Sequence, residues 1–144
     1  MAAGARVLGL DVGDARIGLA TGAVGSLLAF GRGALERHGT KKDVPAILQL
    51  MAEDGAAAAI VGLPLRLDGA ESAQTERVRR FAAALEAAGA VVEFEDERLT
   101  TRIAQRQVGA SDLPRGRRQE KGRLDEAAAV LILESYLRRV QDQS

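Results

Sequence analysis

The chain has 144 residues, and its 20 Lys and Arg side chains balance 20 Asp and Glu side chains, so the formal net charge is zero. This length suits a single domain with one core, and any attraction to a polyanion must come from local clustering of charge. The absence of cysteine excludes disulfides and thiolate zinc sites. The single histidine, His38, nearly excludes histidine-rich metal sites and Ser-His-Asp catalysis, which leaves oxygen ligands and hard cations such as Mg²⁺ or Mn²⁺.

Glycine-bearing turns and changes of apolar spacing divide the chain into strands and helices. The expected elements are strands over 6–12, 17–21 and about 27–32, a helix over 41–51, a strand over 56–62, a helix over 71–88, a strand over 90–94, a short helix from about 100 to 108, a Gly-, Pro- and Arg-rich stretch over 109–122 and a last helix over about 123–140. The first three strands predict an antiparallel meander, and the two helix-to-strand crossovers predict parallel pairing. The fold class is therefore α/β, a mixed five-stranded sheet with helices on both faces.

Asp11 lies near the end of an apolar run that reads as a strand covered on both faces. A buried ionised carboxylate is costly unless something positive compensates it, and a metal ion would do so. The alternative is a turn anion that accepts backbone N–H bonds from the Gly13 loop.

Further acidic residues are expected beyond the carboxyl ends of the central strands, where α/β sheets place their functional sites. Asp96 and Glu97 follow the last strand, and Asp125 and Glu126 lie in the first turn of the expected last helix. Spacing alone does not choose within either pair. Each also has a simpler explanation, because Glu97 could be a solvated strand-end charge and Asp125 could complement the helix macrodipole.

Three converging carboxylates repel one another at neutral pH unless divalent cations lie between them. Two bridged ions can activate a water, stabilise a pentacovalent phosphate and hold the leaving oxygen. The constellation therefore predicts phosphodiester hydrolysis.

Four stretches in register, Val7–Ala20, Ile60–Gly69, Asp96–Thr101 and Lys121–Leu133, together closely resemble the YqgF family, also called RuvX. This family belongs to the RNase H-like superfamily, near the RuvC resolvases. The resemblance covers nearly the whole chain. It implies a nuclease with an RNase H-like fold, which acts in 5′-end processing of pre-16S ribosomal RNA or resolves Holliday junctions.

Carried over by position, the resemblance implies that the catalytic and metal-binding acids are Asp11, Glu97 and Asp125, which hold two Mg²⁺ or Mn²⁺ ions. This resolves the two choices that spacing left open. RuvC resolvases carry a further aspartate three residues after the helical one, whereas Ala128 stands there in this chain. We therefore expect weaker metal binding than in those resolvases.

The segment from Arg98 to Arg123 carries eight Lys and Arg side chains against two acidic ones, a net charge of +6. A basic segment beside a carboxylate site suits a nucleic-acid partner, although a solvated loop with no partner would have the same composition. We expect residues 109–121 to be mobile until substrate binds. The candidate substrate-binding residues are Arg16, Arg98, Arg102, Arg106, Arg115, Arg117, Arg118, Lys121 and Arg123.

Three Phe and one Tyr are too few for a base-stacking platform, so recognition of the shape and backbone of the nucleic acid is favoured.

No run of about 18 apolar residues and no signal-peptide pattern occur, which predicts a soluble cytoplasmic protein with no membrane partner. Gly18 and Gly62 would let substrate approach the backbone, or serve loop geometry alone. Thr100 and Thr101 could cap the helix after Glu97.

Three classes of function remain open. The preferred one is a metal-dependent nuclease that cuts RNA, with a resolvase acting on branched DNA as its variant. The second is a nucleic-acid-binding factor without catalysis. The third follows from the likeness of Asp11-Val12-Gly13 to the phosphate loop of sugar kinases and actin-like ATPases, but those proteins need two such domains. The chain could act as a monomer or as a homodimer, and junction resolution would favour the dimer.

Overall fold

The computed structural model describes residues 1–98 and 118–143. Its elements, in chain order, are β1 (Arg6–Val12), β2 (Arg16–Ala23), β3 (Ala29–Glu36), α1 (Thr40–Asp54), β4 (Ala56–Leu63), α2 (Ala73–Ala87), β5 (Val92–Asp96) and α4 (Arg118–Asp142). In this part of the chain no helix is long and apolar enough to cross a membrane.

The strands form one five-stranded sheet in the order β3-β2-β1-β4-β5. β1 pairs antiparallel with β2 and β2 pairs antiparallel with β3, whereas β4 is parallel to both β1 and β5. The predicted meander and the predicted parallel pairs are both confirmed. As a result, β1, β4 and β5 all end at the same edge of the sheet.

Two strands are displaced from their predicted positions. β3 was expected over about 27–32 but spans Ala29–Glu36, and it contains a register shift opposite Leu19 and Ala20. β5 was expected over 90–94 but spans Val92–Asp96. The N–H of Ala90 donates to the carbonyl of Leu85 and so still belongs to the C-terminal cap of α2, which delays the start of the strand.

The last helix begins earlier than predicted. α4 starts at Arg118, so residues 118–121, expected in a mobile loop, are helical. Gly122 suggested a helix boundary, but one glycine costs only about 1 kcal/mol within a helix. Favourable helix formers flank it, and its nearest neighbour across the interface is Ala34 of β3. The expected short helix over 100–108 and residues 109–117 of the loop lie outside the described residues.

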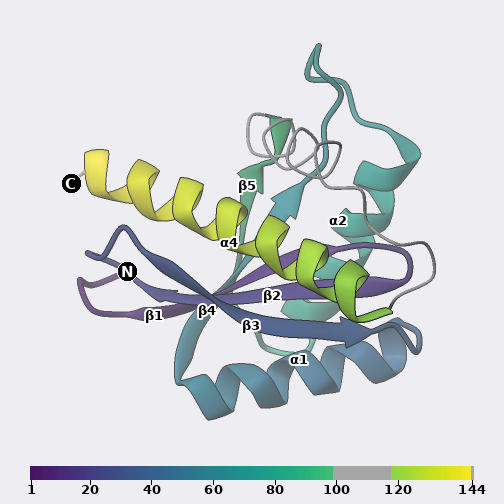
Figure 1. The fold of residues 1–144 in the computed structure, drawn as a ribbon, viewed down its shortest axis with the longest axis horizontal. Coiled ribbons are helices and arrows are strands. Elements are labelled where there is room, and N and C mark those ends of the chain that lie inside the picture. The colour runs from purple at the N-terminus through teal and green to yellow at the C-terminus, as the bar shows by residue number, and fades with distance from the viewer. Residues whose placement is uncertain (99–117, 144) are drawn as a thin grey trace.

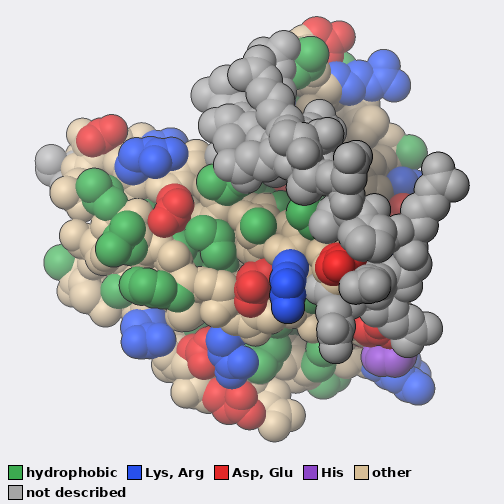
Figure 2. Space-filling view, viewed as in Figure 1, with side chains coloured by type: hydrophobic (Ala, Val, Ile, Leu, Met, Phe, Trp, Pro, Cys, Tyr) green, Lys and Arg blue, Asp and Glu red, His purple; other side chains and the backbone are tan. Residues whose placement is uncertain are grey.

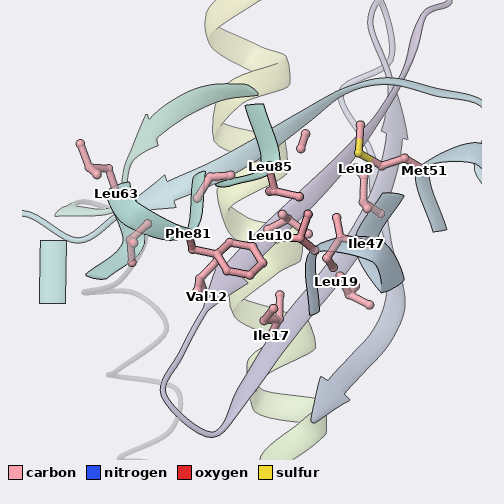
Figure 3. Packing of buried hydrophobic residues seen from close by; sticks show 14 residues of the cluster. Leu8, Leu10, Val12, Ile17, Leu19, Ile47, Met51, Leu63, Phe81 and Leu85 are labelled. Carbon is pink, nitrogen blue, oxygen red and sulfur yellow. The ribbon is translucent and has the colours of Figure 1, made fainter. Parts of the chain in front are cut away.

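Alternating residues of β1 face two separate cores. Leu8, Leu10 and Val12 pack with α1 and α2, including Ile47 and Phe81, as Figure 3 shows. Val7 packs on the other face with α4 residues such as Leu133, Tyr136 and Leu137. α4 therefore covers one face of the sheet, and α1 and α2 cover the other (Figure 1).

Candidate active site

Strand alternation directs Asp11 toward α4. In β1 the side chains of Leu10 and Val12 enter the core beneath α1 and α2, so Asp11 between them points to the opposite face. Its partner across the ladder is Gly18 of β2, which has no side chain. The carboxylate consequently lies at the carboxyl end of β1, on the face that α4 covers.

Glu97 reaches the same place from β5. Its N–H donates to the carbonyl of Leu63, 3.1 Å away, which continues the parallel ladder one residue past the strand. Gly62 provides room for the side chain, because a Cβ there would lie 2.5 Å from Oε1 of Glu97. Glu97 is only 8% exposed, so its carboxyl is held within the protein rather than in solvent.

Asp11 and Glu97 share a hydrogen bond between their carboxyl groups, and both pKa values are raised. Burial is the largest cause for each. For Glu97 the negative charge of Asp11 and the hydrogen bond between them add to it, and the pKa reaches about 9. The pair therefore holds a proton at neutral pH, as adjacent carboxylates do when both cannot ionise.

Asp125 approaches the pair from α4. It lies seven residues after the start of the helix, about two turns in, rather than in the first turn as predicted. The helix backbone runs very close to β2 here, since a Cβ at Gly18 would lie 1.9 Å from the carbonyl oxygen of Asp125. The charge of Asp125 contributes to the raised pKa of Asp11. Its Oδ2 accepts a hydrogen bond of 2.7 Å from Nε of Arg16.

The oxygen donors of the Asp11–Glu97 pair fit a hard divalent cation. The two carboxyl groups touch and hold a proton that a cation could replace. The third predicted ligand is close but turned aside, because Asp125 is paired with Arg16. Among the described residues, no group of three or more His, Cys, Asp or Glu side chains is arranged to hold a metal ion. Arg16 therefore competes with a cation for the carboxylate of Asp125.

The structure also separates the neighbouring acids that spacing could not. Burial opposes ionisation of Asp96, but hydrogen bonds from Arg98 outweigh it and hold the pKa of Asp96 below its ordinary value. Glu126 turns to β3, where it accepts the N–H of Gly33. Asp96 and Glu126 are therefore engaged elsewhere.

This geometry contradicts two of the simpler explanations, the turn anion for Asp11 and the charge at the helix N-terminus for Asp125. The N–H of Gly13 donates to the carbonyl of Arg16, 2.9 Å away, and is not available to Asp11 as a turn donor. Asp125 is too far into α4 to complement the unpaired N–H groups of its first turn.

The candidate phosphate-binding residues differ in their surroundings. Arg16 forms an ion pair with Asp125, and Arg98 forms one with Asp96. Lys121 and Arg123 are exposed on α4. On the face seen in Figure 2, acidic and basic side chains of the described residues are interspersed rather than gathered by sign. The backbone of Arg118 lies in α4, and the predicted residues outside the described part of the chain are Thr100, Thr101, Arg102, Arg106, Arg115 and Arg117.

Sequence reasoning missed the packing role of the glycines. Gly18 and Gly62 were considered as places where substrate approaches the backbone, but Gly18 admits the α4 backbone and Gly62 admits Glu97 and Ile132. Gly31 likewise leaves space for the carboxyl group of Glu126. Glycines within strands often mark such close approaches, and this was the available signal.

Known proteins resemble this chain over nearly its whole length. A family described as "RuvX: Holliday junction resolvase" matches residues 5–139. The chain is 49% identical over 134 residues to the "Putative pre-16S rRNA nuclease" of Thermus thermophilus, covering 93% of this chain and 98% of that one. It is 44% identical over 133 residues to "Ribonuclease YqgF" of Deinococcus radiodurans, covering 92% and 88%.

Solved structures give the same fold at low sequence identity. The RuvC of T. thermophilus in complex with a Holliday junction substrate has a TM-score of 0.58 at 18% identity, over 94% of this chain and 96% of that one. The yeast mitochondrial Holliday junction resolvase has a TM-score of 0.54 at 12% identity, over 96% and 80%. The expected RNase H-like fold is confirmed, and the chain belongs to the RuvX (YqgF) family of nucleases.

Proposed function

We propose that this chain is a divalent-metal-dependent nuclease that hydrolyses phosphodiester bonds with Asp11, Glu97 and Asp125 as catalytic metal ligands. The observation that carries the proposal is the buried pair of Asp11 and Glu97, which share a proton beside the charge of Asp125. Nothing in the packing of the sheet requires two adjacent carboxyls there. Strongly perturbed carboxyls at the carboxyl edge of a sheet are typical of functional sites.

The chain's own residues prepare the site in two ways. Asp11 and Glu97 must give up their shared proton, which leaves both carboxylates free to bind a cation. Asp125 would turn from its ion pair with Arg16 toward them, which would free the Arg16 guanidinium to hold a substrate phosphate. When bound, Mg²⁺ or Mn²⁺, expected as two ions, supplies Lewis-acid polarisation of the phosphate and lowers the pKa of the attacking water.

The proposed substrate is precursor 16S rRNA, cut during 5′-end processing. The names of the relatives in T. thermophilus and D. radiodurans support an RNA substrate, and such a substrate would place the protein in the cytoplasm. Lys121 is exposed four residues before Asp125 on α4, about one helical turn away, and would hold the backbone of the strand. Arg123 is also exposed on this helix. The basic residues between Arg98 and Arg118 would extend this contact.

Resolution of Holliday junctions is the second candidate, favoured by the description of the matching family and by the likeness to the RuvC fold. A resolvase would have to present two sites related by a two-fold axis, so it would act as a homodimer. A factor that binds nucleic acid without cutting it is the third, and it would bind without divalent ions.

The test compares the wild type with Asp11→Asn, Glu97→Gln and Asp125→Asn on labelled precursor rRNA, unrelated RNA and four-way junctions, each with Mn²⁺, Mg²⁺ or a chelator. Asp96→Asn is the matched control, because Asp96 precedes Glu97 but pairs with Arg98. We expect all three site variants to lose cleavage and the control to keep it. Cleavage that persists in all three would mean that the activity arises elsewhere.

A further inference from the structure

A cavity of about 560 Å³ lies on the face of the sheet opposite the acidic pair. It is lined by Val12 and Gly13 at the end of β1, by the N-terminus of α1 and by α2. Its volume falls within the range of small-ligand sites. Val12 and Phe81 lie toward one another in Figure 3 and both belong to the lining and to the core beneath it.

An ion pair between Arg37 and the buried carboxylate of Asp43 fixes the shape of the cavity. Nε of Arg37 donates to Asp43, 2.7 Å away, its NH1 donates to the carbonyl of Gly13, 2.9 Å away, and its guanidinium stacks over Phe81. Asp43 is 1% exposed. Arg37 thereby joins the β1–β2 turn, α1 and α2, so the walls are held in place before any ligand binds.

The charges on the lining are mostly positive. Three arginines, Arg37, Arg77 and Arg80, stand against one carboxylate, Asp14, in a chain whose net charge is zero. Arg77 and Arg80 are three residues apart on α2 and share a face. Their side chains are 50% and 70% exposed, so their guanidinium groups are open to a ligand in solvent.

The present partners of these two arginines are weak enough for an anion to compete with. Arg77 lies 3.3 Å from Asp14, whose side chain is 74% exposed, and Arg80 lies 3.9 Å from an exposed Glu76. Arg77 also donates two exposed hydrogen bonds to Oε1 of Gln74, of 3.1 Å from Nε and 2.7 Å from NH2. Exposed ion pairs of this kind contribute little stability. A phosphate accepts two parallel hydrogen bonds from a guanidinium and would bind more strongly.

The cavity is also adjacent to the catalytic edge. Val12 and Gly13 follow Asp11 directly, and the side chains of Asp11 and Val12 leave opposite faces of the same strand. A nucleic-acid strand held at Asp11 would therefore need only to cross the β1–β2 turn to reach Arg77.

We infer that this cavity binds a phosphate of the substrate strand beside the one that is cleaved, with Arg77 and Arg80 as its ligands. The identity of the ligand rests on the proposed function, but the cavity and its charge do not. The phosphate is either the 5′-terminal group or an internal phosphodiester. In both cases the site strengthens binding and positions the strand, and it takes no part in the hydrolysis itself.

The test measures binding of the full chain to a 3′-labelled oligoribonucleotide of about 16 nucleotides, carrying either a 5′-phosphate or a 5′-hydroxyl, by fluorescence anisotropy in EDTA. The variant is Arg77→Gln/Arg80→Gln. The control is Arg79→Gln, which removes one positive charge from the same helix, at a residue that pairs with Glu71 and is absent from the cavity lining.

The double variant should weaken binding about tenfold, and the slope of log K against log salt should become less negative by about 0.7, the value for one lost phosphate contact on a single strand. A loss confined to the 5′-phosphorylated RNA identifies the terminal phosphate, and a loss for both RNAs identifies an internal one. The Arg79→Gln control should bind like the wild type.

Cleavage measured in Mn²⁺ separates this inference from the proposed function. The double variant should raise KM and leave kcat unchanged. If it binds and cleaves like Arg79→Gln, the cavity is not a phosphate site, although the nuclease proposal stands. If no variant or wild type cleaves but the binding difference persists, the nuclease proposal fails and the cavity remains a nucleic-acid contact.

Discussion

Gly18→Ala tests how the backbone of α4 positions Asp125. A Cβ at residue 18 would lie 1.9 Å from the carbonyl oxygen and 2.3 Å from the carbonyl carbon of Asp125. Ordinary van der Waals contact begins at 3.4 Å, so the helix and the strand must separate by about 1.5 Å. The atoms that clash belong to the helix backbone, which cannot rotate away as a side chain can.

The variant should remain folded but lose activity. Overpacking of this kind costs about 1–3 kcal/mol, while the core that Leu133 and Tyr136 form with the sheet still holds α4 in place. A displacement of about 1 Å at a catalytic group can cost roughly 100-fold in rate. We therefore expect kcat for precursor rRNA in Mn²⁺ to fall by about that factor.

Gly122→Ala is the matched control, because a Cβ there meets only Ala34, at 3.7 Å. It should keep kcat and gain up to about 1 kcal/mol of stability, since alanine is the better helix former. Stability is measured by urea unfolding and kcat by steady-state cleavage at saturating RNA. If Gly18→Ala folds and cleaves like the wild type, the contact between α4 and β2 does not position Asp125.

The remaining predictions concern Glu97, the proton of the acidic pair and the ion pair of Arg37 with the buried Asp43. Gly62→Ala places a Cβ 2.5 Å from Oε1 of Glu97 and should therefore lower kcat. Because it displaces only flexible side-chain ends, it should cost less stability than Gly18→Ala. Cleavage and urea-unfolding assays on both variants measure the two effects. Without divalent ions, the folded pair of Asp11 and Glu97 keeps a proton up to about pH 9, whereas Glu97 in the unfolded chain releases it above about pH 4.5. The free energy of unfolding should therefore decline between about pH 4.5 and pH 9, by at most about 1.4 kcal/mol per pH unit. Saturating Mn²⁺ should remove this decline, and urea unfolding that is insensitive to pH in EDTA would contradict the shared proton. Asp43→Ala leaves Arg37 without its carboxylate partner and should cost about 3 kcal/mol by thermal unfolding; an unchanged Tm would mean that the pair is not structural.

Much of the fold follows from local patterns that the sequence displays. Three strand-like runs separated by glycine-bearing turns predicted the antiparallel meander, and helix-to-strand crossovers predicted the parallel strands. The ends of elements were less accurate, because caps and long-range packing set them. β5 begins two residues late, after the cap bond of Ala90, and α4 begins at Arg118 despite Gly122.

The candidate site depends on contacts that local patterns do not encode. Spacing placed Asp11 at a strand end but could not choose Glu97 or Asp125, and those choices came from resemblance to a family. The pairing of Arg16 with Asp125 joins residues 109 positions apart, and the shared proton depends on the burial that the complete fold creates. Pair contacts of this kind follow from tertiary packing, which a single sequence does not specify.

The most direct test of the metal-dependent mechanism is the anomalous difference density of Mn²⁺ in crystals of the wild type and of Asp11→Asn. We predict density within about 2 Å of carboxylate oxygens of Asp11 and Glu97, with Asp125 turned from Arg16 toward the ion, and loss of that density in the variant. Wild-type crystals with no Mn²⁺ at the pair, from protein that cleaves RNA in the same buffer, would contradict the account.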